Sequence, residues 1–194
     1  DIIIVPGSKS TLDDLFELRR NGVAQAILRA HREGKTVLGI CGGFQILGRE
    51  VLDPDGVEGS IHQLPGLGLL PTSTSMTGEK ITRQVSFPFK GHEGLKGYEI
   101  HMGETRILEQ AEPFVVFPDG HTDGCFVSQK CMGTYIHGIL DNDSFINYLL
   151  EPYLDKLDHS EIDYQAYKEE QYDKLAAHVR AHVDVQKLYE IMGR

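Results

Sequence analysis

The sequence has few cysteines, little positive charge and no long apolar run, and each shortage excludes a class of protein. Its 194 residues include three cysteines, Cys41, Cys125 and Cys131, without the CxxC spacing of a thiolate zinc site. An odd, unpaired set argues against a disulfide framework and favours a reducing compartment. Lys and Arg number 19 against 29 Asp and Glu, which gives a formal net charge of −10. A nucleic-acid partner is therefore not expected.

The chain also lacks the segments that direct a protein into or across a membrane. No apolar stretch approaches the roughly 20 residues of a membrane span, and no basic region precedes a signal-like run. We expect a cytoplasmic protein with no membrane partner. Asp1 is followed at once by the strand-like run IIIV, which predicts a fragment of a longer polypeptide. Residues 1–194 suffice for one domain with a full hydrophobic core.

Strand-like and helix-like segments alternate over the first fifty residues. Two short β-branched runs, Ile2–Val5 and Thr36–Ile40, predict buried strands. Helices are predicted from an N-cap at Thr11 to about residue 20, over Val23–Glu33, and over Phe44–Val51. Continuous apolar strands separated by helices are typical of a parallel sheet covered on both faces. The predicted fold class is α/β, a doubly wound and mostly parallel sheet.

The rest of the chain is less regular. The segment 56–97 is rich in Gly, Pro, Ser and Thr, which predicts loops and antiparallel edge strands rather than a separate domain. Further strands are expected at 68–70, 81–87, 98–107 and 124–137. Helices are expected near the C-terminus, from a cap at Asp141 or Asn142 to about Leu150, from Ser160 to Val183, and from a cap at Asp184 to Met192.

A cysteine stands between glycines where the second strand gives way to a helix. Gly39-Ile40-Cys41-Gly42-Gly43 has the form G-x-C-x-G, the thiol version of the G-x-S-x-G nucleophile elbow. Residues that flank such an elbow lack side chains because sheet and helix approach closely there. The helix N-terminus favours a thiolate. We expect Cys41 to be an exposed, activated nucleophile rather than a small buried hydrophobe.

Attack by a thiolate on a carbonyl requires donors for the resulting oxyanion. The Gly42 amide follows the nucleophile directly. Gly7 and Ser8 lie at the carboxyl end of the first strand, the edge where ligands of α/β folds collect. The sequence GSKST in this loop does not fit G-x-x-x-x-G-K-[ST], because Val5 and Pro6 precede Gly7 and Ser8 separates Gly7 from Lys9, so a phosphate-binding loop is rejected.

A thiol nucleophile also needs a proton acceptor, and histidine fits best near neutral pH. His137 stands at the end of the strand-like run in GTYIHGIL. A lone histidine at a strand end is usually structural, but pairing with an elbow cysteine favours a catalytic role. No metal site is expected, since His178 and His182 lack the glutamate of H-E-x-x-H.

These residues resemble the class I, triad-type glutamine amidotransferases, whose elbow is similar to GICGGFQ. More closely, VPGSKST, GICGGFQILG, GYEIHMGET, GTYIHGIL and YDKLAAHVRAHVDVQKLYEIM resemble the C-terminal glutaminase domain of cobyric acid synthases. The similarity covers nearly the whole chain in the expected order. It implies a class I glutamine amidotransferase-like fold that is truncated at the N-terminus. The related lipid II and cobyrinate amidotransferase domains share the elbow and the histidine.

The resemblance implies that Cys41 and His137 hydrolyse glutamine to glutamate and ammonia. The ammonia would reach an N-terminal synthetase domain of the same chain, which amidates adenosylcobyrinic acid a,c-diamide carboxylates to give cobyric acid in cobalamin biosynthesis. ATP and Mg are expected in that absent domain, no cofactor is expected in this one, and the corrinoid substrate would bind mainly elsewhere. The resemblance further implies that Gln45, Ile100 and His101 contact the substrate glutamine.

The sequence departs from the wider family at one place. Many members carry a glutamate two residues after the histidine, where Ile139 stands here. The imidazole would then belong to a Cys-His dyad or be oriented by a substitute carboxylate, Glu99 or Glu104. Two other functions stay open: another cysteine hydrolase, such as a γ-glutamyl peptidase, and a non-catalytic docking or redox-sensing module that carries a thiol.

Overall fold

The computed structural model describes residues 1–109, 111–156 and 164–193. The chain divides into two compact units, Asp1–Tyr153 and Leu154–Arg194. The assignment of residues 1–194 to one glutaminase domain stays a prediction.

A four-stranded sheet lies at the centre of the first unit. Its strands run in the order β1 (Ile2–Val5), β2 (Thr36–Ile40), β10 (Cys131–Thr134) and β9 (Cys125–Ser128). β2 pairs in parallel with β1 and with β10, whereas β9 pairs antiparallel with β10. The predicted bounds of β1 and β2 are confirmed, and the sheet is mostly parallel as predicted.

Helices cover both faces of this sheet. Val37 packs in one apolar cluster, and the next residue, Leu38, packs in another. Because successive strand residues point to opposite faces, the two clusters lie on opposite sides. The first cluster takes side chains from α1 (Thr11–Arg20), α2 (Val23–Arg32) and α3 (Gly42–Leu47), and the second takes them from α4 (Asp143–Leu150).

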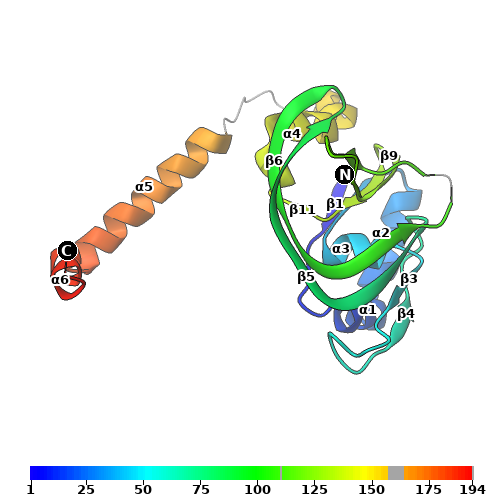
Figure 1. Cartoon of the computed structure of the whole chain (residues 1–194). Coiled ribbons are helices and arrows are strands. Elements are labelled where there is room, and N and C mark those ends of the chain that lie inside the picture. The colour runs from blue at the N-terminus through cyan, green and yellow to red at the C-terminus, as the bar shows by residue number, and fades with distance from the viewer. Residues whose placement is uncertain (110, 157–163, 194) are drawn as a thin grey trace. The chain divides into compact units, whose positions relative to one another are not determined.

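A second sheet is largely antiparallel. Its order is β11-β6-β5-β3-β4, and only the β3–β5 pair is parallel. The hairpin of β5 and β6 forms a long curved ribbon (Figure 1), which turns at Lys90 and Gly91 with φ of 47° and 85°. The strands of this second sheet are β3 (Glu50–Leu52), β4 (Gln63–Pro65), β5 (Thr72–Phe89), β6 (His92–Ile107) and β11 (Ile136–His137). A small separate sheet consists of β7 (Val115–Val116) and β8 (Thr122–Asp123).

Several predicted boundaries were wrong. The helix after the elbow ends at Leu47 instead of Val51, because Gly48 turns into extended backbone and residues 50–52 pair as β3. Residues 68–70 are not a strand, and the run 124–137 forms three strands instead of one. α1 begins at Thr11, so its N-cap is Ser10.

A single-turn helix, η1 (Ile139–Asp141), precedes α4, and Asn142 is the N-cap of α4. A longer 3₁₀ helix, η2 (Glu151–Lys156), follows α4. In the second unit lie α5 (Tyr164–His182) and α6 (Val185–Ile191), and the Asp184 side chain caps α6 by accepting from the Lys187 amide at 3.0 Å. Ser160, the predicted start of α5, lies outside the described residues.

Candidate active site

Cys41 occupies a tight turn between the end of β2 and the start of α3. Its φ is 54°, a left-handed conformation that costs a non-glycine residue of order 1–3 kcal/mol and is found mainly at functional sites. The Cys41 amide donates to the Thr134 carbonyl at 2.8 Å. The turn therefore has the geometry of a nucleophile elbow and is tied to β10.

The glycines around Cys41 pack too closely to accept a side chain, as expected from the sequence. A Cβ on Gly43 would lie 1.8 Å from the Val5 carbonyl oxygen, and one on Gly42 would lie 2.7 Å from the Ser8 nitrogen. A Cβ on Gly39 would meet the Gly43 backbone at 2.8 Å. Since such contacts fall below van der Waals distance, glycine at these positions lets α3 reach β1 and the loop after it.

His137 comes to the same place from the other sheet. A Cβ built on Gly7 would lie 3.4 Å from His137 Cε1 and 3.9 Å from Cys41 Sγ. The two side chains, 96 positions apart in the sequence, thus both lie within 4 Å of one point beside the loop that follows β1. The structure brings together Cys41, His137, Gly7, Ser8 and Gly42.

The backbone of β6 faces both reactive groups. The Cys41 thiol donates to the Ile100 carbonyl at 3.5 Å, and the same carbonyl interacts with the His137 ring. The Tyr98 ring stacks on His137 with a centroid distance of 5.0 Å and an interplanar angle of 10°. Nε2 of His137 is buried and has no hydrogen-bond partner among the described residues, so this nitrogen is free to exchange a proton.

The structure does not show the exposed thiolate that the sequence predicted. Cys41 is only 8% exposed. Burial raises the pKa of its thiol, the charges of Glu58 and Asp123 add to the rise, and the Gly42 amide opposes it. Burial likewise lowers the pKa of His137, and its contact with the Ile100 carbonyl opposes that shift. Both side chains are therefore neutral at neutral pH.

Gln45 is buried rather than solvent-facing. Its Oε1 accepts from the Thr11 hydroxyl at 2.9 Å, and its Nε2 donates to the Tyr135 hydroxyl at 3.1 Å. With 3% of its surface exposed, Gln45 joins α1, α3 and the segment before His137. Its contact with glutamine stays a prediction.

His101 lies beside the reactive groups on β6. Its ring stacks on Tyr135 with a centroid distance of 3.7 Å, and its Nδ1 hydrogen-bonds to the Gly103 carbonyl at 2.9 Å. Burial lowers the pKa of His101. Its substrate role, like that of Ile100, stays a prediction.

Neither proposed substitute carboxylate reaches the imidazole. Glu99 is buried and pairs with Arg83. Glu104 is exposed, lies near Arg106 at 3.9 Å, and is six residues along β6 from Tyr98, the partner of His137. At about 3.3 Å per residue this is roughly 20 Å. Orientation of His137 by Glu104 is thus wrong, and Glu99 is occupied by Arg83.

Two carboxylates near the site were missed by sequence reasoning. Glu58 accepts from the Thr11 amide at 2.6 Å and raises the pKa of Cys41 by its charge. Buried Asp53 shapes the loop that carries Glu58, by accepting from the Val57 amide at 2.7 Å and the Glu58 amide at 2.9 Å. Asp123, on β8, is 5% exposed and also acts on Cys41. Neither carboxylate lies in a local motif that signals its role.

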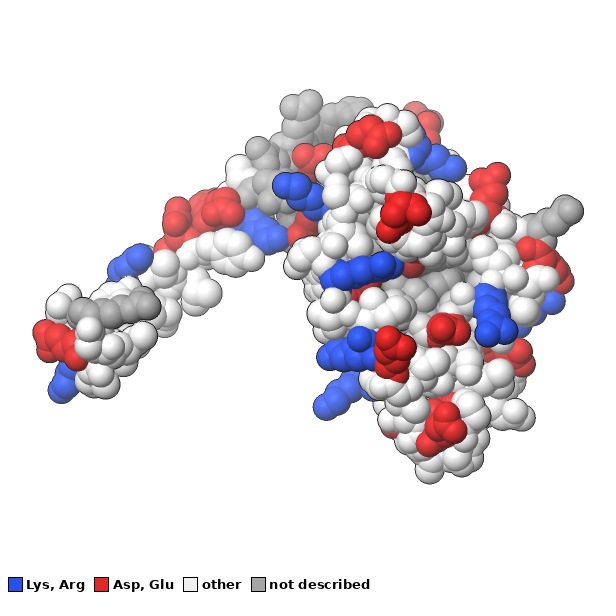
Figure 2. Space-filling model, in the orientation of Figure 1, with Lys and Arg blue, Asp and Glu red and all other residues white. Residues whose placement is uncertain are grey.

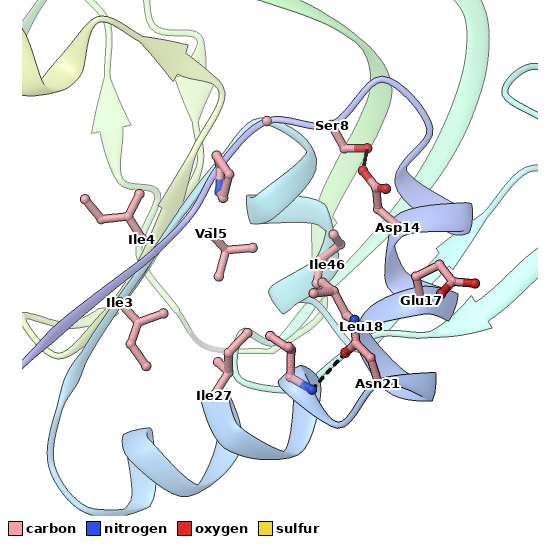
Figure 3. A pocket seen from close by; sticks show the side chains of 13 residues that line it. Ile3, Ile4, Val5, Ser8, Asp14, Glu17, Leu18, Asn21, Ile27 and Ile46 are labelled. Carbon is pink, nitrogen blue, oxygen red and sulfur yellow. Dashed lines mark hydrogen bonds between the residues drawn. The ribbon is translucent and has the colours of Figure 1, made fainter.

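Two cavities of about 410 Å³ flank these elements. One lies below the β5–β6 ribbon and is lined by polar groups that include His101, Glu99 and Asp123. Figure 3 shows the other, an apolar hollow between β1, α1 and α2, with the Ser8 hydroxyl bonded to Asp14 at its rim. The back of the Gly7–Ser8 loop borders this hollow, and neither Cys41 nor His137 lines it.

Charge is mixed over the visible face of the first unit, where Lys and Arg side chains lie among Asp and Glu (Figure 2). Within residues 1–109, 111–156 and 164–193, no group of three or more His, Cys, Asp or Glu side chains is placed to hold a metal ion. None of the helices that the structure describes has the length and apolar character of a membrane span.

Comparison with known sequences places the chain among known proteins. The model of the CobB/CobQ-like glutamine amidotransferase domain matches residues 1–145. The cobyric acid synthase of Phocaeicola vulgatus is 67% identical over 197 residues and that of Bacteroides fragilis is 65% identical over 195 residues. The matches cover 100% and 99% of this chain but only 40% and 39% of those proteins. The chain thus spans about two fifths of the length of these curated relatives.

Solved structures support the fold. A crystal structure of a glutamine amidotransferase aligns with a TM-score of 0.59 and 22% identity, over 77% of either chain. The PurLQS structure from Thermotoga maritima aligns with a TM-score of 0.54 and 20% identity, over 78% of this chain and 79% of that one. The mixed α/β fold is therefore that of class I glutamine amidotransferases, as predicted.

Proposed function

The chain belongs to the CobB/CobQ-like glutamine amidotransferase family, and on that premise we propose that it hydrolyses glutamine through a thioester on Cys41. The observation that carries this proposal is the meeting of Cys41, His137 and the loop after β1 around Gly7. A nucleophile on a strained turn, a base with a free nitrogen and nearby backbone amides are the parts that acyl transfer requires.

In the first half-reaction, Cys41 Sγ attacks the side-chain carbonyl carbon of glutamine and forms a C–S bond, while its proton passes to His137 Nε2. The amide of Gly42 and an amide of Gly7 or Ser8 donate to the oxyanion. The C–N bond then breaks as His137 returns the proton to nitrogen, and ammonia leaves. The product on the enzyme is a γ-glutamyl thioester.

In the second half-reaction, His137 takes a proton from water, which attacks the thioester carbonyl. The C–S bond breaks, the sulfur recovers a proton from His137, and glutamate leaves. The neutral imidazole favoured by burial is the form needed to begin either half-reaction. The buried neutral thiol implies that proton transfer accompanies substrate binding or attack.

Glu58 is the group best suited to recognise the ammonium end of the substrate. Its carboxylate is fixed against the N-terminus of α1 and lies close enough to Cys41 to raise the thiol pKa. A substrate ammonium there would offset that charge and thereby ease ionisation of the thiol. Glutamine, rather than a neutral amide, would then activate its own nucleophile.

This chain corresponds to about two fifths of the length of its longer relatives. Their name, cobyric acid synthase, is the basis on which we propose the whole reaction. The ammonia would serve ATP-dependent amidation of adenosylcobyrinic acid a,c-diamide in a synthetase part of the same polypeptide, where ATP and Mg would bind. Glutamine is the partner of the Cys41 site, and the corrinoid would bind mainly outside this chain. The cytoplasmic location stays a prediction.

Labelling with the glutamine analogue 6-diazo-5-oxo-L-norleucine tests the proposal. We expect covalent label on Cys41 by mass spectrometry, protection by glutamine, and no label in Cys41→Ser. Cys125→Ala is the matched control, since Cys125 is buried with a pKa raised to about 11, and it should label like the parent protein. Label on another residue, or equal label in Cys41→Ser, would contradict the proposal.

The buried, neutral state of Cys41 also favours a second candidate, a non-catalytic thiol-bearing module. The two differ in their response to substrate. In a glutaminase, saturating glutamine or a slow analogue lowers the pKa that governs alkylation of Cys41. In a docking or redox-sensing module, the alkylation profile does not change with glutamine. Hydrolysis of other γ-glutamyl compounds in preference to glutamine would instead indicate a related cysteine hydrolase.

A further inference from the structure

The segment that carries His137 crosses from one sheet to the other within one residue. β10 ends at Thr134 in the four-stranded sheet, β11 begins at Ile136 in the second sheet, and only Tyr135 lies between them. Backbone groups at such a crossing lose their regular strand partners, and a buried one without a replacement costs free energy. The position of His137 depends on how these groups are satisfied.

One buried carboxylate supplies hydrogen bonds, directly or through one side chain, to most of the polar groups at this crossing. Asp123 accepts from the Tyr135 amide at 3.0 Å and from the Thr134 hydroxyl, and Thr134 Oγ1 accepts from the Ile136 amide at 3.0 Å. Asp123 therefore holds three consecutive residues, directly or through Thr134. His137 is the next residue.

The same crossing is bonded to the nucleophile. The Thr134 carbonyl accepts from the Cys41 amide, while the Thr134 side chain is held by Asp123. One residue thus links the elbow to the histidine segment. A change in Thr134 would move both reacting side chains.

Asp123 is itself held in a fixed position. Gly124 follows with φ of 70°, and a Cβ there would lie 2.3 Å from the Gly133 carbonyl oxygen and 2.7 Å from Phe114 Cβ. The chain therefore passes β10 without room for adjustment. The charged groups that act on Asp123 from β5 and β6 are Arg83 and Glu99, which pair with each other.

We propose that Asp123 is a positioning residue, which sets the separation of Cys41 and His137 by holding the crossing from Thr134 to Ile136. It takes the place of a carboxylate bonded directly to the imidazole, which neither Glu99 nor Glu104 supplies. This inference rests on the proposed Cys-His mechanism and assigns no contact between Asp123 and substrate.

The test compares Asp123→Ala, Asp123→Asn, Thr134→Val and Thr134→Ser in the whole protein. Asp123→Asn keeps an acceptor for the Tyr135 amide and offers an NH₂ group to Thr134 Oγ1. We expect Asp123→Ala to lower kcat about 100-fold and Thr134→Val about 10-fold, with KM changed less than threefold, as for geometry lost at the reacting atoms. Asp123→Asn and Thr134→Ser should retain kcat within about fivefold.

Asp119→Asn is the matched control, because Asp119 is exposed, pairs with His121 and lies in the turn of the β7–β8 hairpin that carries Asp123. It should leave kcat unchanged. For each variant, the rate of iodoacetamide alkylation of Cys41 is measured against pH. A displaced His137 removes the inflection that this residue gives to the profile, whereas partial unfolding alters the fraction of reactive protein without moving the inflection.

Folded Asp123→Ala and Thr134→Val proteins with unchanged kcat and an unchanged profile would overturn the inference. If Asp123→Ala fails to fold, Thr134→Val against Thr134→Ser decides by the same two readouts. The proposed function fails separately, if Cys41→Ser hydrolyses glutamine as fast as the parent protein. An inactive Cys41→Ser with normal Asp123→Ala and Thr134→Val would reject only the role of Asp123.

Discussion

Burial sets the protonation of the groups on which the chemistry depends. Cys41, His137 and His101 are each shifted toward the neutral form, chiefly because their side chains lose water. Asp123 shows the same effect more strongly, with its pKa raised to about 7. Cys41 and His137 are therefore both uncharged in this structure, so in the proposed mechanism their charges develop during the reaction.

The pH dependence of glutamine hydrolysis should report the shifted histidine. Because burial lowers the pKa of His137, the acid limb of kcat/KM should fall below the ordinary value of about 6.5. The measurement is kcat/KM against pH, with NMR titration of labelled histidine assigned by His137→Gln. A limb above pH 6.5 that follows His137 would contradict this expectation.

Stability should depend on pH through Asp123. A raised pKa in the folded state means that, between about pH 4 and pH 7, the folded protein binds more protons than the unfolded chain. The contribution of Asp123 to stability is therefore present at low pH and is lost as pH rises through 7. The midpoint temperature of thermal unfolding of Asp123→Asn, measured relative to that of the parent protein, should rise from pH 4.5 to pH 8.

The reverse trend, or a difference that does not vary with pH, would contradict that linkage. Asp119→Asn serves as the reference, because its side chain is exposed and its pKa is lowered by His121. The two substitutions replace Asp by Asn in the same β7–β8 hairpin, one at a buried and one at an exposed position. Only Asp123→Asn, which removes the buried carboxylate, should show a relative unfolding midpoint that rises toward high pH.

At the scale of elements, the elbow depends on a close approach of α3 to β1. Gly43→Ala would put a methyl group 1.8 Å from the Val5 carbonyl oxygen, and backbone cannot yield as a flexible side chain does. We expect a loss of about 3 kcal/mol or more in the free energy of unfolding, together with loss of glutaminase activity. Urea unfolding measures the first, and release of glutamate measures the second.

Gly78→Ala is the control for Gly43→Ala. Gly78 has no neighbour within 4 Å of a built Cβ and is not among the positive-φ residues, so its substitution should change stability by less than about 0.5 kcal/mol. Equal effects at the two positions would mean that close packing at the elbow does not determine stability.

Elements with a strong local pattern could be predicted from the sequence. The run TVLGI gave the bounds of β2, and Asp184 was correctly predicted as a cap. The middle of the β5–β6 ribbon gave a weak signal, because TGEKITRQ contains few apolar residues. A strand was predicted only from residue 81. Ile81–Gln84 pair with β6, and the register shifts between Met76 and Ile81, an irregularity that the local sequence does not encode.

The candidate site divides in the same way. Cys41 lies in a local motif and His137 ends a strand-like run, so both could be found from residue types and order. Glu58 reaches the site through Thr11, which lies 47 positions away, and Asp123 through Thr134, which lies 11 positions away. Contacts of this kind depend on the packed fold, and no spacing rule predicts them.

At the scale of the molecule, the two units differ in how their apolar side chains are used. The first unit contains both apolar clusters. In the second, Leu175, Leu188 and Ile191 are 59%, 48% and 74% exposed. The core that holds the candidate site therefore belongs to residues 1–153.

A chain shortened after Tyr153 should keep the fold of the first unit. Tyr153 itself must remain, since its hydroxyl bonds with Thr36 at 2.8 Å and with the Asp1 carbonyl at 2.8 Å. We expect near-ultraviolet circular dichroism and labelling of Cys41 by the diazoketone to be retained. A chain shortened after Asn142 removes α4, with Phe145 and Leu149 of the second cluster, and should lose both signals.

Thr134 links two sheets, and the two proposed reacting side chains come one from each: Cys41 follows β2 directly, and His137 ends β11. The distance between these two side chains thus depends on the junction of the two sheets rather than on either sheet alone. A displacement of about 1 Å of one sheet relative to the other at that junction would lower turnover on the order of 100-fold while leaving each sheet intact. Any partner that brings the two sheets closer together or moves them apart would therefore change the rate of ammonia release.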